Sequence, residues 1–162
     1  MDDLTKSAFL NRPDLHVETE GEFKGWRTWS RDNFETLKGP FYHRMDDQGR
    51  IHCAFRVESK HLNGMRNVHG GCFMAFADYC LFAMAAPVLQ GPGVTVSFAC
   101  EFLDAAREGE RVEGTGEIMR AGGSMIFLRG VLRSGERPLF TFSGTLKRVK
   151  RQMPPAAGNE GK

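Results

Sequence analysis

The chain has 162 residues, of which 41% are hydrophobic and 26% charged, and its net charge is only +2. This length and composition predict one soluble globular domain with a single core. The small net charge argues against a strongly basic nucleic-acid-binding surface, so we expect no nucleic-acid partner. Four cysteines without C-x-x-C spacing indicate neither zinc nor a disulfide framework. Residues 1–4 are too acidic for a secretory signal, and we expect a cytoplasmic protein.

The sequence divides into an arm, a domain and a tail. Residues 1–38 carry mixed charge and little periodicity, but they include three large apolar residues: Phe23, Trp26 and Trp29. We therefore expect this segment to be an arm that packs on the main domain, which should occupy residues 39–150. Residues 151–162 are rich in Pro, Gly and Ala and predict a disordered tail.

The domain begins with a predicted β-hairpin. Residues 41–45 read as a strand, and residues 46–49 form a turn signal. In the next segment Ile51, Cys53 and Phe55 alternate with more polar residues, which is typical of a half-buried strand.

A long apolar segment follows, and we expect a helix from about residue 70 to about residue 89. Residues 72–89 are as long as a short membrane span, but Asp78 at the centre and Pro87 near the end argue against insertion in a membrane. A helix that is apolar nearly all round is otherwise a buried core helix, and we predict that location.

Four further strand-like segments complete the domain, at residues 94–102, 112–119, 125–132 and 139–146. The short links predict an antiparallel meander. In the first segment five residues are expected to share one face: Val94, Val96, Phe98, Cys100 and Phe102. The order of elements indicates an α+β fold, with an antiparallel sheet of about six strands wrapped around one central helix.

The residues that indicate a chemical function are Asn63, the triplet His69-Gly70-Gly71, and Asp78. The triplet places a turn at the start of the helix, where free N–H groups can stabilise a developing negative charge. A carboxylate inside an apolar helix is costly to bury unless it is paired or used in catalysis.

These residues resemble the signature of the PaaI-like hotdog-fold acyl-CoA thioesterases. His69 follows Asn63 by six positions, Asp78 follows His69 by nine positions, and a Gly-Val-Thr-Val strand comes after them. The resemblance extends over roughly residues 39–148 and departs from the usual pattern at Arg66 and Gly123. It implies a hotdog fold, hydrolysis of acyl-CoA or aryl-CoA thioesters, no cofactor beyond the CoA of the substrate, and a homodimer or homotetramer with active sites between subunits.

We assign roles to five residues as hypotheses. The Gly71 N–H would polarise the thioester carbonyl, and Asp78 would act as general base or as nucleophile. Asn63 could hold the carbonyl or the water, and His69 could fix the turn or touch the thioester sulfur. Thr95 matches a Ser/Thr position that orients the water in relatives.

Helix geometry predicts that one thioester needs two chains. Asp78 lies on the order of 10 Å along the axis from Gly71, whereas reacting atoms must approach to roughly 3–3.5 Å. A two-fold dimer could bring Asp78 of one chain to the helix start of the other.

Substrate contacts are predicted at two further places. The turn that relatives use for the nucleotide of CoA corresponds to Arg120, Gly122, Gly123 and Ser124, and Gly70 belongs to the helix start. Phe73, Tyr79 and Phe82 are candidates for an apolar acyl pocket, although core packing would explain them equally well.

Two alternatives remain open. Each candidate residue also has a structural explanation, such as a turn-forming role for Asn63 or a capping role for His69. A non-catalytic acyl-CoA-binding sensor of the same fold is the alternative function.

Overall fold

The computed structural model describes residues 15–30 and 32–149. Its elements, in chain order, are β1 (Leu15–Val17), β2 (Arg27–Trp29), α2 (Asn33–Lys38), β3 (Tyr42–Met45), β4 (Ile51–Arg56), the short 3₁₀ helix η1 (Ser59–His61), α3 (Gly70–Leu89), β5 (Gly93–Phe102), β6 (Arg111–Ala121), β7 (Met125–Ser134) and β8 (Arg137–Arg148). The expected tail at residues 151–162 and the first part of the arm lie outside the described residues.

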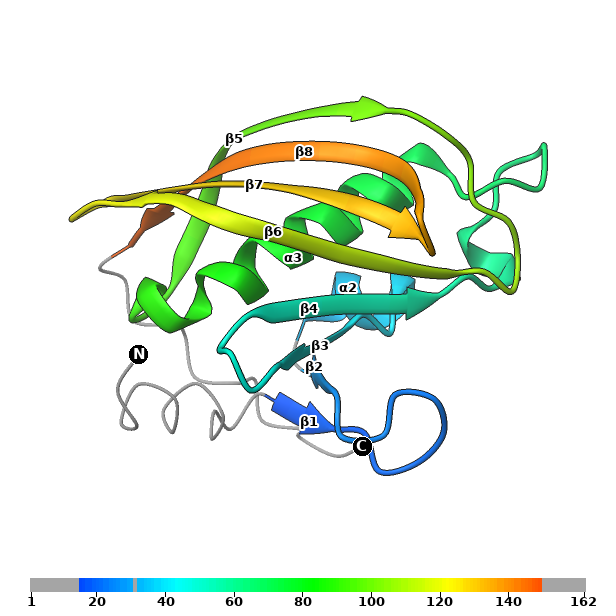
Figure 1. The fold of residues 1–162 in the computed structure, drawn as a ribbon, viewed down its shortest axis with the longest axis horizontal. Coiled ribbons are helices and arrows are strands. Elements are labelled where there is room, and N and C mark those ends of the chain that lie inside the picture. The colour runs from blue at the N-terminus through cyan, green and yellow to red at the C-terminus, as the bar shows by residue number, and fades with distance from the viewer. Residues whose placement is uncertain (1–14, 31, 150–162) are drawn as a thin grey trace, which may run out of the picture.

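An antiparallel sheet curls around α3, and this confirms the hotdog architecture (Figure 1). The described strands form one sheet in the order β1-β2-β3-β4-β6-β7-β8-β5. The sheet therefore has eight strands rather than the predicted six. The two extra strands, β1 and β2, come from the arm and have three residues each. Strands this short carry too little alternation to be recognised in a sequence.

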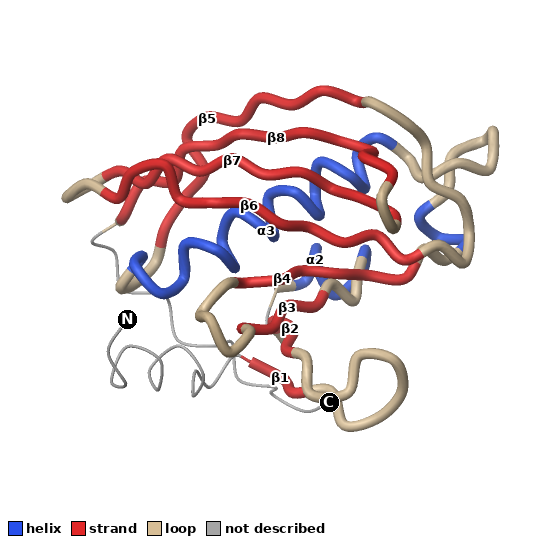
Figure 2. The backbone as a smooth tube through the Cα atoms, in the orientation of Figure 1, coloured by secondary structure: helices blue, strands red, loops and turns tan. Residues whose placement is uncertain are grey.

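The predicted meander is correct for β6, β7 and β8 and wrong for β5. Strand β5 pairs with β8 at the far edge of the sheet, and β6 pairs instead with β4. The eight residues 103–110 can reach roughly 26 Å. The distance from β5 to β6 across β8 and β7 is three strand spacings, or only about 14 Å. The link is thus long enough to cross the end of the sheet (Figure 2).

Helix α3 fills the concave side of the sheet, as the sequence predicted. It is long and apolar enough to cross a membrane by length and composition, but 56% of its most apolar stretch is buried inside the protein. Glycines on the strands let the helix approach closely. A Cβ on Gly114 would lie 2.5 Å from the Cys80 sulfur, and one on Gly144 would lie 2.3 Å from a Leu81 methyl carbon.

The arm covers the outer side of the β3–β4 hairpin. The Phe23 ring stacks on Tyr42 with ring centroids 4.4 Å apart, and Trp26 is buried with them. Ala54 of β4 is fully buried because the arm covers it, although simple alternation would leave it facing solvent. The inward residues Cys53 and Phe55 belong to the main core, as predicted.

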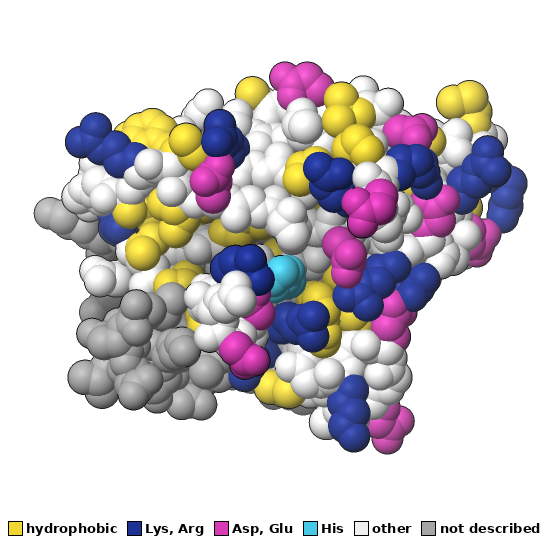
Figure 3. Space-filling model, viewed as in Figure 1, with side chains coloured by type: hydrophobic (Ala, Val, Ile, Leu, Met, Phe, Trp, Pro, Cys, Tyr) yellow, Lys and Arg dark blue, Asp and Glu magenta, His cyan; other side chains and the backbone are white. Residues whose placement is uncertain are grey.

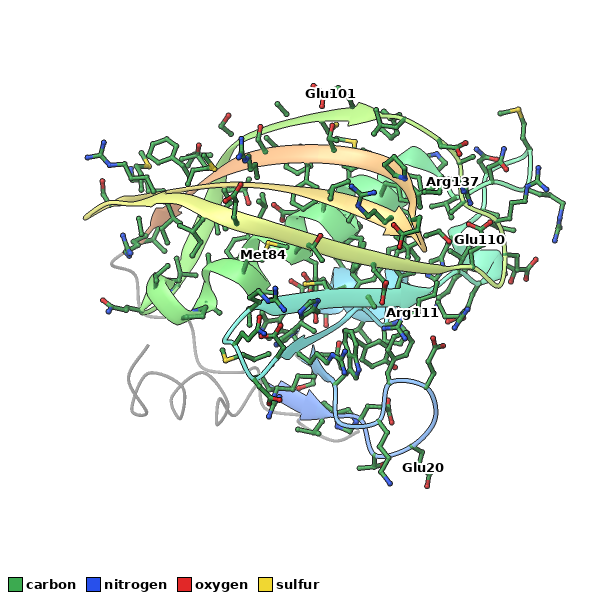
Figure 4. The ribbon with its side chains drawn as sticks, in the orientation of Figure 1. Glu20, Met84, Glu101, Glu110, Arg111 and Arg137 are labelled. Atoms are coloured by element: carbon green, nitrogen blue, oxygen red, sulfur yellow. The ribbon has the colours of Figure 1, made fainter. Side chains whose placement is uncertain are left out.

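Charged side chains tie the ends of these elements together. Arg137, at the start of β8, pairs with Glu110 before β6, and Arg111 pairs with Glu22 of the arm; Figure 4 shows Arg137, Glu110 and Arg111 near one end of the sheet. On the face seen in Figure 3, acidic and basic side chains are interspersed and form no single-sign patch. Exposed pairs of this kind contribute little stability each.

The close approach of β6 to β7 gives a stability prediction. A Cβ on Gly116 would lie 2.3 Å from the Arg129 carbonyl oxygen and 3.0 Å from the sulfur of Met84, which α3 carries beneath the sheet. Because a backbone atom cannot move cheaply, we expect Gly116→Ala to lower the free energy of unfolding by about 1–3 kcal/mol. Urea unfolding measures the change.

The matched control is Gly64→Ala, where an added Cβ meets no atom within 4 Å. Equal urea midpoints of unfolding for the two variants would contradict the proposed packing of β6 on β7.

Candidate active site

One side of α3 remains open in the single chain. Residues spaced by three or four positions are exposed or half-buried along it; this open stripe consists of Gly71, Met74, Asp78 and Phe82. Most residues on the other sides of the helix are buried in the core. Asp78 thus lies where the core helix meets solvent, at the edge of the apolar interior.

Asp78 is held by Thr95 of β5. The Thr95 hydroxyl donates a hydrogen bond of 2.6 Å to Asp78 Oδ1. Burial raises the pKa of Asp78, and the negative charge of Asp32 adds to the increase, while the bond from Thr95 opposes it. A carboxylate with raised proton affinity and a fixed orientation is well suited to take a proton from water.

A β-bulge brings Thr95 to this position. Thr95 pairs with Leu146, but Ser97 pairs with Thr145, so one extra residue, Val96, interrupts the register. The predicted face of β5 was therefore wrong at its start: Val94 and Val96 are exposed, at 45% and 50%. Bulges of this kind re-aim side chains next to functional sites.

The start of α3 is capped by His69. The His69 Nδ1 atom accepts a 2.9 Å hydrogen bond from the Gly71 N–H, and the His69 carbonyl oxygen accepts one from the Cys72 N–H at 2.8 Å. The Gly71 N–H, predicted to bind the thioester carbonyl, is therefore engaged within the chain. The Gly70 N–H is the first of the helix and has no intrahelical acceptor.

Asn63 shapes the loop before the helix. Its Oδ1 atom accepts hydrogen bonds from the N–H groups of Met65, at 2.9 Å, and Asn67, at 3.2 Å. Arg66 adopts a left-handed conformation with φ of 60°, which Gly adopts more readily than a residue with a side chain. Arg66 also pairs with Glu108, and the loop keeps its turn although the residue is not Gly.

The predicted nucleotide turn lies at the opposite end of the helix. The Arg148 guanidinium donates to the carbonyl oxygens of Gly122 and Gly123, and also to that of Val88 at the end of α3. Arg120 and Ser124 are exposed beside it. The turn is therefore fixed near the helix C-terminus, far from Gly70 of the same chain (Figure 1).

Two of the predicted pocket residues lie in the core. Phe73 is 2% exposed, and Tyr79 is 1% exposed with its hydroxyl 2.7 Å from His43 Nδ1. Both project away from the open stripe, so within this chain only Phe82 remains available to an acyl group. A residue four positions from Asp78 lies on the same helix face, which explains why Phe82 is the one that fits.

Sequence reasoning missed one carboxyl group near Asp78. Glu35 of α2 is half-buried, and its pKa is raised to about 8, first by burial and then by the charges of Asp32 and Asp78. Nothing in the polar arm sequence indicated this, because the position depends on how α2 docks on the domain. In the described part of the chain no group of three or more His, Cys, Asp or Glu residues could hold a metal ion.

Comparison with known proteins agrees with this architecture. The family model described as "Thioesterase superfamily" matches residues 65–141. A Pseudomonas aeruginosa protein named "Putative esterase PA0474" is 36% identical over 110 residues, which are 67% of this chain and 82% of that one. Human "Acyl-coenzyme A thioesterase 13" is 26% identical over 96 residues, or 59% and 69% of the two chains.

Solved structures share the fold. An N33D mutant of the phenylacetic acid degradation protein PaaI from Thermus thermophilus superposes with a TM-score of 0.64 at 24% identity, covering 73% of this chain and 100% of that one. A hypothetical thioesterase from Streptococcus pneumoniae, solved with coenzyme A, gives 0.62 at 19% identity, covering 70% and 91%. Fold and family match together define a hotdog-fold hydrolase of thioesters. The chain belongs to the thioesterase superfamily.

The raised pKa of Asp78 gives a prediction about stability. A carboxyl group whose pKa is higher in the folded chain stabilises the fold at low pH, and this contribution is lost as the pH rises through the folded pKa. Asn cannot ionise and can still accept the bond from Thr95. We expect Asp78→Asn to melt at a higher temperature than wild type at pH 8, with the difference shrinking toward pH 4.

Calorimetry across this pH range measures the effect. A variant that melts below wild type at pH 8 would show that ionised Asp78 stabilises the fold, contrary to the burial argument.

Proposed function

We propose that the protein hydrolyses acyl-CoA or aryl-CoA thioesters to the free acid and CoA, with Asp78 as general base or nucleophile. The observation that carries this proposal is the location of Asp78: a carboxylate of raised pKa, oriented by Thr95, on the open stripe of an otherwise buried helix. Among the described residues its hydrogen-bond partner is the neutral hydroxyl of Thr95, so no ion pair there explains a charge at this position. Thr95 can also orient the attacking water.

The proposed hydrogen-bond donor to the thioester carbonyl is the N–H of Gly70 rather than that of Gly71. Since Gly71 donates to His69 Nδ1, Gly70 supplies the N–H that can point at a developing oxyanion, with the helix dipole behind it. His69 then acts by holding the helix start in place. Asn63 acts in the same way on the preceding loop, and its Nδ2 amide can donate to the thioester carbonyl or the water.

The proposed site lies between two copies of the chain. Asp78 is eight residues beyond Gly70, or about 12 Å along the axis, so one chain cannot present both groups to one carbonyl carbon. Strand β5 supports the dimer: it is a ten-residue edge strand beside the open stripe, and long unpaired edges favour pairing with another chain. In a two-fold dimer each chain contributes to both sites.

The substrate would extend along the chain that supplies Asp78. The turn at Gly122–Ser124 is fixed beside the C-terminal end of α3, so it lies on the same side of the proposed site as Asp78. Arg148 occupies the carbonyl oxygens of this turn, which leaves the N–H groups of Gly123 and Ser124 and the guanidinium of Arg120 to bind phosphate. Phe82 would line the acyl side.

Thiol release from short, medium, long and aryl acyl-CoAs tests the proposal. We expect Asp78→Asn to lower kcat by about 10²–10⁴-fold, because proton transfer to the carboxylate is lost. The control is Asp47→Asn, which makes the same chemical change on an exposed turn and should leave kcat unchanged.

Wild-type turnover that survives in Asp78→Asn would reject the assignment of Asp78. Tight acyl-CoA binding without thiol release by wild type would instead favour the non-catalytic sensor.

A further inference from the structure

Phe102, the last residue of β5, faces the concave side of the sheet and yet stays exposed. Beyond the bulge at Val96, Phe98 and Cys100 pack against the core, and Phe102 continues the same face of the strand. Its side chain is nevertheless 56% exposed. The free surface of this ring therefore lies on the side of the sheet that α3 fills, and not on the outer surface.

Helix α3 leaves the ring uncovered because it begins at Gly70, beside the end of β5 (Figure 1). A Cβ on Gly70 would lie 2.9 Å from Cε1 and 3.2 Å from Cζ of Phe102. Since a single C–C bond is about 1.5 Å long, the edge of the ring lies within roughly 4.4 Å of the Gly70 Cα. The ring thus stands next to the N–H group that we propose as the donor to the thioester carbonyl.

A row of buried aromatic rings fixes the position of Phe102. Its ring packs edge to face on Phe140 of β8, with centroids 4.9 Å apart, and Phe140 packs on Phe73 in the first turn of α3 at 5.8 Å. The Leu103 N–H, directly after the ring, donates a 2.9 Å hydrogen bond to the Leu139 carbonyl oxygen. The sheet and the helix therefore both hold the ring in place beside the helix start.

A thioester carbonyl bound at the Gly70 N–H comes close to this ring. Its oxygen lies about 3 Å from the Gly70 nitrogen, and the ring begins at a similar distance from the same residue. One of the two substituents of the carbonyl, the sulfur or the acyl group, then contacts the ring. The proposed contacts of CoA belong to the chain that supplies Asp78, whereas Phe102 belongs to the chain that supplies Gly70. The acyl group is therefore the substituent that meets Phe102.

We propose that Phe102 is a substrate-contacting residue, whose ring packs on the acyl group directly beside the thioester carbonyl and favours an aryl group there. This inference rests on the proposed thioesterase activity. An aromatic group placed on the face or the edge of a Phe ring gains more than a saturated group of the same size. A flexible alkyl chain also loses rotational freedom when it packs on a fixed ring.

Hydrolysis of benzoyl-CoA and cyclohexanecarbonyl-CoA, which differ in the aromaticity of one six-membered ring, tests this preference. The ratio of their kcat/KM values cancels any general effect of a substitution on CoA binding or on the catalytic groups. We expect Phe102→Leu, which keeps an apolar side chain and removes the ring, to lower the preference for benzoyl-CoA by about 2–10-fold. Phe102→Tyr retains the ring and should keep the wild-type ratio.

The matched control is Phe127→Leu, which makes the same change at an exposed ring of β7. Its neighbours Ile126 and Leu128 are buried in the core, so Phe127 points away from α3. This control should keep the wild-type ratio. A ratio that also stays unchanged in Phe102→Leu would overturn the proposal.

The same two acyl groups carried by N-acetylcysteamine separate contact with the acyl group from contact with the CoA arm. This thiol retains the part of CoA next to the sulfur and lacks the rest. We expect Phe102→Leu to lower the benzoyl preference equally on both thiols. A loss that is equal for the two acyl groups and smaller with the truncated thiol would place Phe102 on the CoA arm and contradict the proposal.

Binding distinguishes failure of this inference from failure of the proposed function. Calorimetry gives the Kd of both acyl-CoAs for proteins that carry Asp78→Asn, with Phe102 or Leu at position 102. If wild type hydrolyses neither thioester but Phe102→Leu loses a preference for binding benzoyl-CoA, the ring contact stands and the proposed function fails. If hydrolysis is present and neither the kinetic nor the binding ratio changes in Phe102→Leu, the thioesterase activity stands and the inference fails.

Discussion

The structure depends on one constraint: a single apolar helix is enclosed by a curled sheet while one carboxylate on it stays at the edge of the interior. Enclosure of α3 gives the chain its core, and glycines such as Gly114 and Gly144 let the strands approach it. Because Asp78 lies on the open stripe, its burial is partial, and this burial raises its pKa.

The groups that surround Asp78 or complete its proposed site come from other segments of the chain. The bulge in β5 supplies the Thr95 hydroxyl, and His69 fixes the helix start by binding the Gly71 N–H. The proposed chemistry therefore draws on an edge strand and a capped helix, and each is placed by hydrogen bonds within the chain that do not involve the substrate.

The sequence predicted those features that depend on local pattern. Apolar residues between a His-Gly-Gly turn and a Gln-Gly-Pro-Gly stop defined α3 from Gly70 to Leu89, and alternation defined the β3–β4 hairpin. It did not predict that β5 pairs with β8, because the partner of a strand is chosen by the whole sheet. The bulge at Val96 left no local signal, and the burial of Glu35 follows from docking of the arm rather than from its own neighbours.

The central claim is that one thioester is hydrolysed by groups from two chains, and mixing two inactive variants tests it most directly. Gly70→Pro removes the N–H and adds a ring that fits the first position of a helix, since His69 before it is extended, with ψ of 135°. A Cβ at this position would lie 2.9 Å from a ring carbon of Phe102, so Gly70→Ala, which adds that Cβ and keeps the N–H, is the control. Refolding Gly70→Pro together with Asp78→Asn should restore roughly a quarter of wild-type activity, because half the dimers carry one intact site. A mixture as inactive as its components would place both groups in one chain and contradict the account.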